Sequence, residues 1–164
     1  MNFHIPTKVT TYSIFLMTLI LASCAKDSTN EFTGRVQPIS MSPVDEVELG
    51  NAKASALLQL GGGSHPNYNL QGFIDQVGAK LVNSSVAASS GYTFDFELLN
   101  DKRTINAFAL PGGKIFLTYG LTELTTSEDQ LAVILAHEIA HVLGRHATER
   151  ITENASNSND LNVL

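Results

Sequence analysis

The spacing of apolar residues predicts two helices in the first half of the chain. Ser42 is a suitable N-cap, Pro43 a suitable first residue, and Gly61 a stop signal, so we expect a helix over residues 43–60. A glycine-rich loop follows. Apolar residues then recur at helical spacing on one face of a second helix, at Leu70, Phe73, Val77 and Leu81.

The period of the pattern changes to two at residues 92–98, where apolar and polar side chains alternate. Such alternation is typical of a half-buried strand. Two further runs, residues 105–110 and 114–119, flank a turn of Pro111, Gly112 and Gly113, and this arrangement predicts a hairpin. We therefore expect an α+β fold in which helices precede a small antiparallel sheet.

A last helix is expected after Ser127, because Ser127 and Gln130 have the spacing of a capping box. Apolar residues occupy nearly every side of this helix between residues 131 and 143, which predicts a buried position at the centre of the fold. The helix nevertheless carries His137, Glu138 and His141. Ionisable side chains in such a helix need a partner, because an unpaired buried charge costs several kcal/mol.

These three residues form an HExxH sequence over residues 137–141. The two histidines lie about 40° apart on one helix face, so both imidazoles can reach one metal ion. Glu138 can lie beside the metal without binding it, which is the place of a general base. Zinc held by imidazoles polarises a carbonyl and makes bound water acidic, so the motif predicts amide hydrolysis. The alternative is an exposed helix that binds no metal.

The N-terminus predicts a secreted lipoprotein. An apolar run over residues 12–22 is too short to span a bilayer, follows Lys8 and ends in small residues, as in a signal peptide. Leu21-Ala22-Ser23-Cys24 resembles a bacterial lipobox, in which cleavage before Cys24 leaves a lipid-modified cysteine; a buried cysteine is the alternative. We therefore expect a signal peptide over residues 1–23 and attachment to a membrane through lipid on Cys24.

Composition narrows the partners and the compartment. The 10 basic and 16 acidic residues give a net charge of -6, which argues against nucleic acid as a partner. The single cysteine excludes a disulfide framework and a cysteine-rich zinc site. Ala25 follows Cys24 where inner-membrane lipoproteins of enterobacteria carry Asp, so this resemblance favours the outer membrane, facing the periplasm. Nothing in the sequence indicates an oligomeric state.

The mature chain divides into three parts. Residues 24–41 are polar and lack periodicity, which predicts a tether between lipid and domain, with order beginning near Ser42. Residues 42–150 hold the predicted helices, the sheet and the HExxH sequence. Residues 151–164 are rich in Asn and Ser and predict a polar tail.

An ordered set of segments resembles the zinc metallopeptidase family M48, whose members are gluzincins. The segments are Asn106-Ala-Phe-Ala-Leu-Pro-Gly-Gly-Lys-Ile-Phe, then Glu128-Asp-Gln-Leu-Ala, then His137-Glu-Ile-Ala-His-Val-Leu-Gly-Arg-His-Ala-Thr-Glu-Arg150. The resemblance covers about residues 41–150 and implies a zincin-like domain acting on misfolded envelope proteins. It implies that His137 and His141 bind Zn²⁺ and that Glu138 activates water. It also implies that the strand of Lys114, Ile115, Phe116 and Leu117 pairs with an extended substrate.

One part of the family pattern is not matched. The family takes its third zinc ligand from a glutamate on a later helix, and the carboxylates downstream of His141 do not lie in such a motif. His146 and Asn106 are candidates for residues that hold the zinc ligands in place without contacting the metal. The alternative for His146 is that it binds the metal directly. Two functions remain open: a zinc endopeptidase of peptides and proteins, or a truncated, inactive pseudoprotease that binds unfolded chains at the membrane.

Overall fold

The structure, a computed structural model, describes residues 26–160, with the side chains of residues 26–158. The predicted signal peptide and the predicted lipidation site at Cys24 lie outside these residues. Among the helices that are described, none has the length and the apolar composition needed to cross a bilayer.

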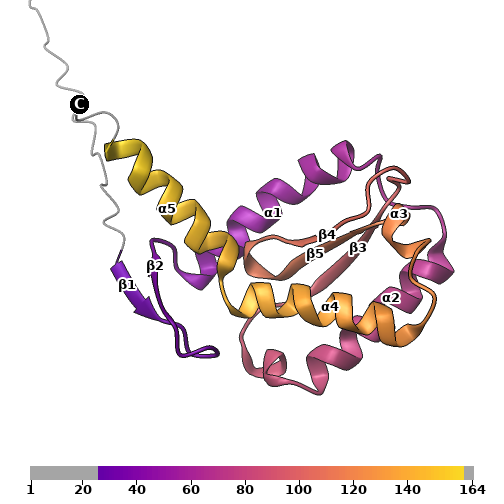
Figure 1. The fold of residues 1–164 in the computed structure, drawn as a ribbon, viewed down its shortest axis with the longest axis horizontal. Coiled ribbons are helices and arrows are strands. Elements are labelled where there is room, and N and C mark those ends of the chain that lie inside the picture. The colour runs from indigo at the N-terminus through magenta and orange to yellow at the C-terminus, as the bar shows by residue number, and fades with distance from the viewer. Residues whose placement is uncertain (1–25, 161–164) are drawn as a thin grey trace, which may run out of the picture.

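The described chain is an α+β fold with two small sheets (Figure 1). Its elements are, in chain order, β1 (Lys26–Thr29), β2 (Val36–Ile39), α1 (Pro43–Leu60), α2 (Tyr68–Asn83), the short 3₁₀ helix η1 (Val86–Ser89), β3 (Asp95–Leu99), β4 (Ala107–Ala109), the 3₁₀ turn η2 (Pro111–Gly113), β5 (Lys114–Thr118), α3 (Tyr119–Thr122), α4 (Glu128–Leu143) and α5 (His146–Asp160). The helices expected after Ser42 and Ser127 are confirmed at their capped starts.

The larger sheet has the strand order β3-β5-β4 and is mixed. β5 pairs in parallel with β3 and antiparallel with β4. The expectation of a purely antiparallel sheet is therefore wrong, although the β4–β5 hairpin is confirmed. Four consecutive residues of β5, from Ile115 to Thr118, are buried, which is typical of a central strand in a sheet that is covered on both faces.

Helices cover both faces of this sheet (Figure 1). α1 packs on one face, and α2 and α4 pack on the other. The core between the sheet and the second pair of helices is formed by Ile74 and Val77 of α2, Phe96 and Leu98 of β3, Ile115 and Leu117 of β5, and Leu131, Leu135 and Ile139 of α4. This core fixes α4 on the sheet.

Within the expected tether, residues 26–39 form a hairpin and are not unstructured. β1 and β2 pair antiparallel, from Lys26 opposite Ile39 to Thr29 opposite Val36, and this hairpin lies beside α5 (Figure 1). Asn30 and Gln37 are buried although both are polar. The prediction failed because the hairpin is held by side-chain amides that bond to backbone, and hydropathy does not reveal such bonds.

The expected polar tail after residue 150 is helical instead, as far as Asp160. Most of α5 is exposed, but Thr148 and Thr152 are buried, four residues apart on the face towards β2. The Thr152 hydroxyl accepts a hydrogen bond from the Ser40 backbone amide at 3.2 Å. Because this contact is narrow and polar, the sequence has no row of apolar residues from which the helix could be predicted.

α4 is buried on one side only, which corrects the expectation of a helix enclosed on nearly every side. Leu131, Leu135 and Ile139 reach the core. On the opposite face Val133 is 71% exposed, and Ala136 and Ala140 are also exposed. The sheet and α2 lie on the same side of the helix, so its apolar outer face has no cover among the described residues.

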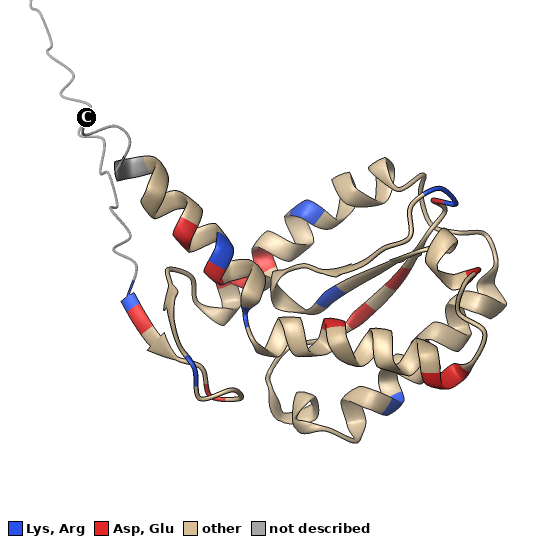
Figure 2. Cartoon of the chain, in the orientation of Figure 1, with Lys and Arg blue, Asp and Glu red and all other residues tan. Residues whose placement is uncertain are grey.

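In the described part of the chain the Lys and Arg residues do not gather on one element (Figure 2), and acidic residues lie in the first turn of two helices. Glu128 and Asp129 lie in the first turn of α4, and Asp45 and Glu46 lie in the first turn of α1. Negative charge at a helix N-terminus is stabilising. The Lys and Arg residues are scattered over separate elements.

The packing of α2 on β3 predicts opposite effects for two glycines of the same helix. A Cβ atom at Gly78 would lie 2.3 Å from Cε2 of the buried Phe96 ring, so Gly78→Ala is expected to lower the free energy of unfolding by about 1–3 kcal/mol. Gly72 has no atom within 4 Å of the added Cβ. Gly72→Ala is the matched control and is expected to raise stability by about 0.5–1 kcal/mol. Urea denaturation measures the free energy of unfolding of both variants. Equal changes in Gly78→Ala and Gly72→Ala would contradict the packing described.

The capping box of α1 predicts a pH-dependent contribution from Asp45. The Ser42 backbone amide, 2.9 Å from Asp45 Oδ2, and then the Ser42 hydroxyl hold the pKa of Asp45 below its usual value. A carboxylate with a depressed folded-state pKa stabilises above its unfolded pKa and loses that effect as the pH falls. Asp45→Asn should therefore lower stability at pH 7, with the difference from wild type closing between about pH 5 and pH 2.

Denaturation curves across this pH range test the capping box. Glu48→Gln, at an exposed position of α1, is the control and should show no such closing difference. A constant difference between wild type and Asp45→Asn would argue against a role for the charge.

Candidate functional site

α4 brings the three predicted residues to one place. The helix begins at the Ser127 cap, whose hydroxyl accepts the Gln130 amide at 3.2 Å, and it ends at Gly144. Its inner residues are fixed by the core, so the helix presents His137 and His141 on successive turns beside β4. The positions of these imidazoles therefore follow from how α4 packs.

The two imidazoles converge. Nε2 of His137 lies 3.0 Å from Nε2 of His141, and the rings meet edge to face. Two nitrogens bound to one zinc at about 2.0–2.1 Å in tetrahedral geometry are about 3.3 Å apart. The pair therefore fits as two ligands of one zinc ion, bound through Nε2 in each case.

Glu138 lies inside the fold next to this pair. Its side chain borders the same cavity, and the residue is 7% exposed. Burial raises the pKa of Glu138, and the neighbouring His141, His137 and the backbone amide of Ala109 act in the opposite direction. A carboxyl group whose pKa is raised accepts a proton more readily, which suits a general base.

His146 supports His141 from the other side of its ring. Nδ1 of His146 lies 2.6 Å from Nδ1 of His141, so the contact is on the nitrogen that faces away from His137. Burial lowers the pKa of His146, and the positive field of His141 acts in the same direction. A neutral His146 can accept the Nδ1 proton of His141, which leaves Nε2 of His141 free for a metal.

These side chains open onto a cavity of about 280 Å³. Its wall comes from β4, η2, the C-terminal half of α4 and the start of α5, and includes Ala107, Phe108, Ala109, His137, Glu138 and His141. Asn106 is not among the lining residues. Its backbone amide donates to Thr118 Oγ1, and the residue is exposed, so its predicted supporting contact to the ligands is not formed here.

The strand expected to pair with substrate is in the wrong position for that role. β5 has a neighbour on each edge, β3 along residues 95–99 and β4 along residues 107–109. Ile115, Phe116 and Leu117 are buried, and Lys114 is 2.6 Å from the Asp95 carboxylate. The prediction for Lys114–Leu117 is thus contradicted: the strand with an open edge beside the cavity is β4.

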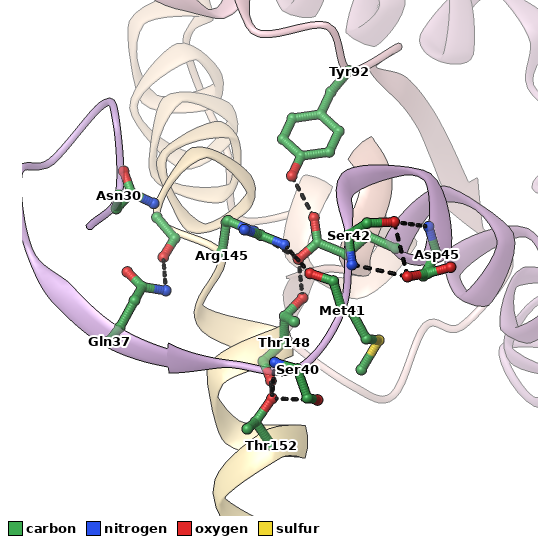
Figure 3. Close-up of polar contacts among 12 residues, drawn as sticks. Asn30, Gln37, Ser40, Met41, Ser42, Asp45, Tyr92, Arg145, Thr148 and Thr152 are labelled. Atoms are coloured by element: carbon green, nitrogen blue, oxygen red, sulfur yellow. Dashed lines mark hydrogen bonds and ion pairs between the residues drawn. The ribbon is translucent and has the colours of Figure 1, made fainter. Parts of the chain in front are cut away.

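A buried carboxylate next to the site was missed from the sequence. Glu46 of α1 is 1% exposed and accepts hydrogen bonds from Arg145, at 2.9 Å, and from the hydroxyls of Thr148 and Tyr92 (Figure 3). Burial, followed by the contact with Glu46, raises the pKa of Tyr92 above its ordinary range. The place of Glu46 in the sequence, in the first turn of α1, gives no sign of these contacts. Its three donors come from distant segments.

Among the described residues, no group of three or more His, Cys, Asp or Glu side chains is arranged to hold a metal ion. The site described here therefore brings together two candidate metal ligands, His137 and His141, with Glu138 beside them. Catalytic zinc sites use three protein ligands and leave one position open.

The chain matches one protein-family model and several known proteins. A model of peptidase family M48 matches residues 69–159, from α2 into α5. Mitochondrial metalloendopeptidase OMA1 of Schizosaccharomyces pombe is 42% identical over 79 residues, covering 48% of this chain and 23% of its own length. The putative beta-barrel assembly-enhancing protease of Vibrio cholerae is 42% identical over 89 residues, covering 54% of this chain and 18% of its own.

The beta-barrel assembly-enhancing protease of Escherichia coli K12 is 36% identical over 129 residues, covering 69% of this chain and 26% of its own length. The chain thus spans about a quarter or less of the length of these relatives. The match to the family model covers more than half of the chain and includes the whole of α4. This chain belongs to peptidase family M48.

Proposed function

We propose that this protein is a zinc-dependent metalloendopeptidase that hydrolyses peptide bonds of misfolded or envelope proteins. The observation that carries the proposal is the pair of Nε2 atoms of His137 and His141, 3.0 Å apart, with the buried Glu138 carboxylate bordering the same cavity. Membership of family M48 supports the same reaction class. The relatives named above, a metalloendopeptidase and two beta-barrel assembly-enhancing proteases, support protein substrates in the cell envelope.

Each residue of the site has a distinct task in this proposal. His137 and His141 would hold the zinc ion, and a neutral His146 would hold the His141 ring by accepting its Nδ1 proton. Zinc, when bound, polarises a carbonyl oxygen and makes water acidic enough to lose a proton near neutral pH. Glu138 would take a proton from the water that attacks the peptide carbonyl carbon and pass it to the nitrogen of the amine that leaves when the C–N bond breaks. Its burial keeps the carboxylate poorly solvated and so favours this transfer.

β4 is the proposed binding edge for an extended substrate. The backbone amide of Leu110 donates to the Lys114 carbonyl, and the Asn106 carbonyl accepts from the Thr118 amide. The even-numbered residues of this segment therefore direct their backbone groups towards β5. In an antiparallel pair the alternate residues direct their backbone groups outward, which places those of Ala107 and Ala109 on the open edge. A peptide paired there would lie along the cavity that holds His137 and Glu138.

The proposed location is the bacterial cell envelope. We place the chain at the outer membrane, facing the periplasm, attached through lipid on Cys24. The support is the lipobox sequence at residues 21–24 and the names of the relatives. A substrate class of misfolded envelope proteins fits a protease held at that surface.

The second candidate is a binding module that holds unfolded chains without cutting them. It is favoured by one observation: the described residues provide two metal ligands where catalytic zinc needs three. In that case the open edge of β4 would still bind extended chains, but zinc would be held weakly.

Replacement of Glu138 separates the two candidates. Glu138→Gln keeps the shape of the side chain but removes the base, so the full chain in detergent should retain zinc and lose cleavage of an unfolded reporter protein by about 10²–10⁴-fold. His141→Ala should lose the zinc itself. Metal analysis by mass spectrometry and a gel assay of the reporter give the two readouts.

Glu153→Gln, at an exposed position of α5, is the matched control and should cleave like wild type. If wild type loses its zinc on dialysis and does not cut the reporter, but still binds it, the binding module is the correct function. Full cleavage by Glu138→Gln would contradict the role given to Glu138.

The open edge of β4 predicts a specific effect of proline. Ala107→Pro removes an amide that faces outward, and proline is tolerated on such an edge, so KM should rise several-fold with kcat nearly unchanged. Phe108→Pro removes an amide that faces β5 and should unfold the hairpin. Steady-state cleavage of an unstructured peptide measures both effects; an unchanged KM in Ala107→Pro would exclude substrate pairing at this edge.

A further inference from the structure

The β1–β2 hairpin is bonded to the C-terminal end of the HExxH helix (Figure 3). The side-chain amide of Asn30 donates to the Leu143 carbonyl oxygen at 2.8 Å, and the side-chain amide of Gln37 donates to the Gly144 carbonyl oxygen at 3.1 Å. Both side chains come from a segment more than 100 residues away in sequence. They bond to consecutive carbonyl groups at the end of α4.

These two carbonyls belong to a helix end that the backbone satisfies only in part. The Gly144 and Arg145 amides donate to the Ala140 and Val142 carbonyls, at 2.8 and 2.9 Å. The last carbonyls of a helix have no partner within it, and the hairpin supplies partners for Leu143 and Gly144. Arg145 then turns the chain with φ at 55°, a left-handed conformation that is unfavourable for a residue other than glycine.

The turn at Arg145 is held from a third side by α1. Nε of Arg145 is 2.9 Å from the buried Glu46 carboxylate, and Nη2 donates to the Met41 carbonyl at 2.7 Å (Figure 3). The C-terminal end of α4 and the turn after it are thus hydrogen-bonded to residues 30, 37, 41 and 46. All of these contacts are made by segments that precede the part of the chain matched by the family model.

The hairpin amides are built into the contact. Asn30 and Gln37 are 4% and 1% exposed, and Gln37 Oε1 is buried without a hydrogen-bond partner in the described structure. A buried oxygen without a hydrogen-bond partner is destabilising. We attribute the burial of Gln37 to the hydrogen bond that its side-chain amide donates to the Gly144 carbonyl.

We propose that the β1–β2 hairpin is a positioning element for the metal site, with Asn30 and Gln37 as positioning residues. The proposal rests on the zinc-binding function given above. His141 lies two residues before Leu143, and His146 lies two residues after Gly144, so the bonded carbonyls separate the two rings that meet at Nδ1. Fixing this turn fixes the contact between the rings and therefore the direction of Nε2 of His141. Loss of the hairpin bonds should weaken zinc binding.

Asn30→Asp tests a single hydrogen bond. Asn30 Oδ1 accepts the amides of Phe32 and Thr33, both at 2.9 Å, and an aspartate can keep those two bonds. Only the donation to Leu143 is lost, and the carboxylate then faces a carbonyl oxygen. An added negative charge attracts a cation, so weaker zinc binding could not be ascribed to the charge itself.

The chain offers a matched control. Asn83→Asp makes the same chemical change at an exposed position in the last turn of α2. Gln37→Glu and its control Gln59→Glu, at an exposed position near the end of α1, form a second pair for use if Asn30→Asp does not fold. The experiment uses the full chain in detergent, with zinc affinity measured by competition against a chromophoric chelator.

Asn30→Asp is expected to raise the Kd for zinc by about tenfold or more, as loss of a group behind a metal ligand does elsewhere, while Asn83→Asp leaves it unchanged. Hydrogen exchange of the metal-free chain gives a readout that does not depend on zinc: amides over residues 141–148 should exchange faster in Asn30→Asp only. Equal Kd values and equal exchange in both variants would overturn the proposal. If wild type binds no zinc, the proposed function fails, and the exchange comparison still decides whether the hairpin holds the turn.

Discussion

A carboxylate and a pair of imidazoles on a helix that packs against a protein core must be compensated by their surroundings, and this constraint governs the structure. Glu138 is enclosed beside His137 and His141, and burial raises the pKa of its carboxyl group. Such a group is costly unless a cation or donor lies nearby. The convergence of the two Nε2 atoms supplies the place for that cation. The sheet, α2 and the capped start of α4 all serve to hold the helix where this can happen.

The second buried carboxylate, Glu46, solves the same problem by a different route. It is compensated by Arg145 and by two hydroxyl groups, without a metal. In doing so it joins α1, the segment before β3 and the junction of α4 with α5. Breaking one member of such a network leaves a charge buried without its partner, which is strongly destabilising. The two carboxylates border the same cavity but are compensated differently, and only Glu46 is paired with an arginine and hydroxyl groups.

Much of the fold could be predicted from local signals. The α1 helix has the predicted bounds because Ser42 and Pro43 at its start and Gly61 at its end act within a few residues. The β4–β5 hairpin and α4 were predicted for the same reason, and HExxH spacing alone brought His137 and His141 together. The place of β5 at the centre of the sheet depends on which strands pair, and adjacent strands in the sequence need not be neighbours in the sheet. The role given to Lys114–Leu117 failed with that prediction.

What could not be predicted was polar and distant in sequence. Asn30 and Gln37 are buried for the bonds they make to Leu143 and Gly144, and no periodic pattern marks such residues. The most direct test of the central claim is X-ray absorption spectroscopy of the zinc-loaded full chain. The account predicts a nitrogen shell at about 2.0–2.1 Å with scattering from two imidazole rings, and loss of the bound zinc in His141→Ala. Zinc without imidazole scattering, or a spectrum unchanged in His141→Ala, would contradict it.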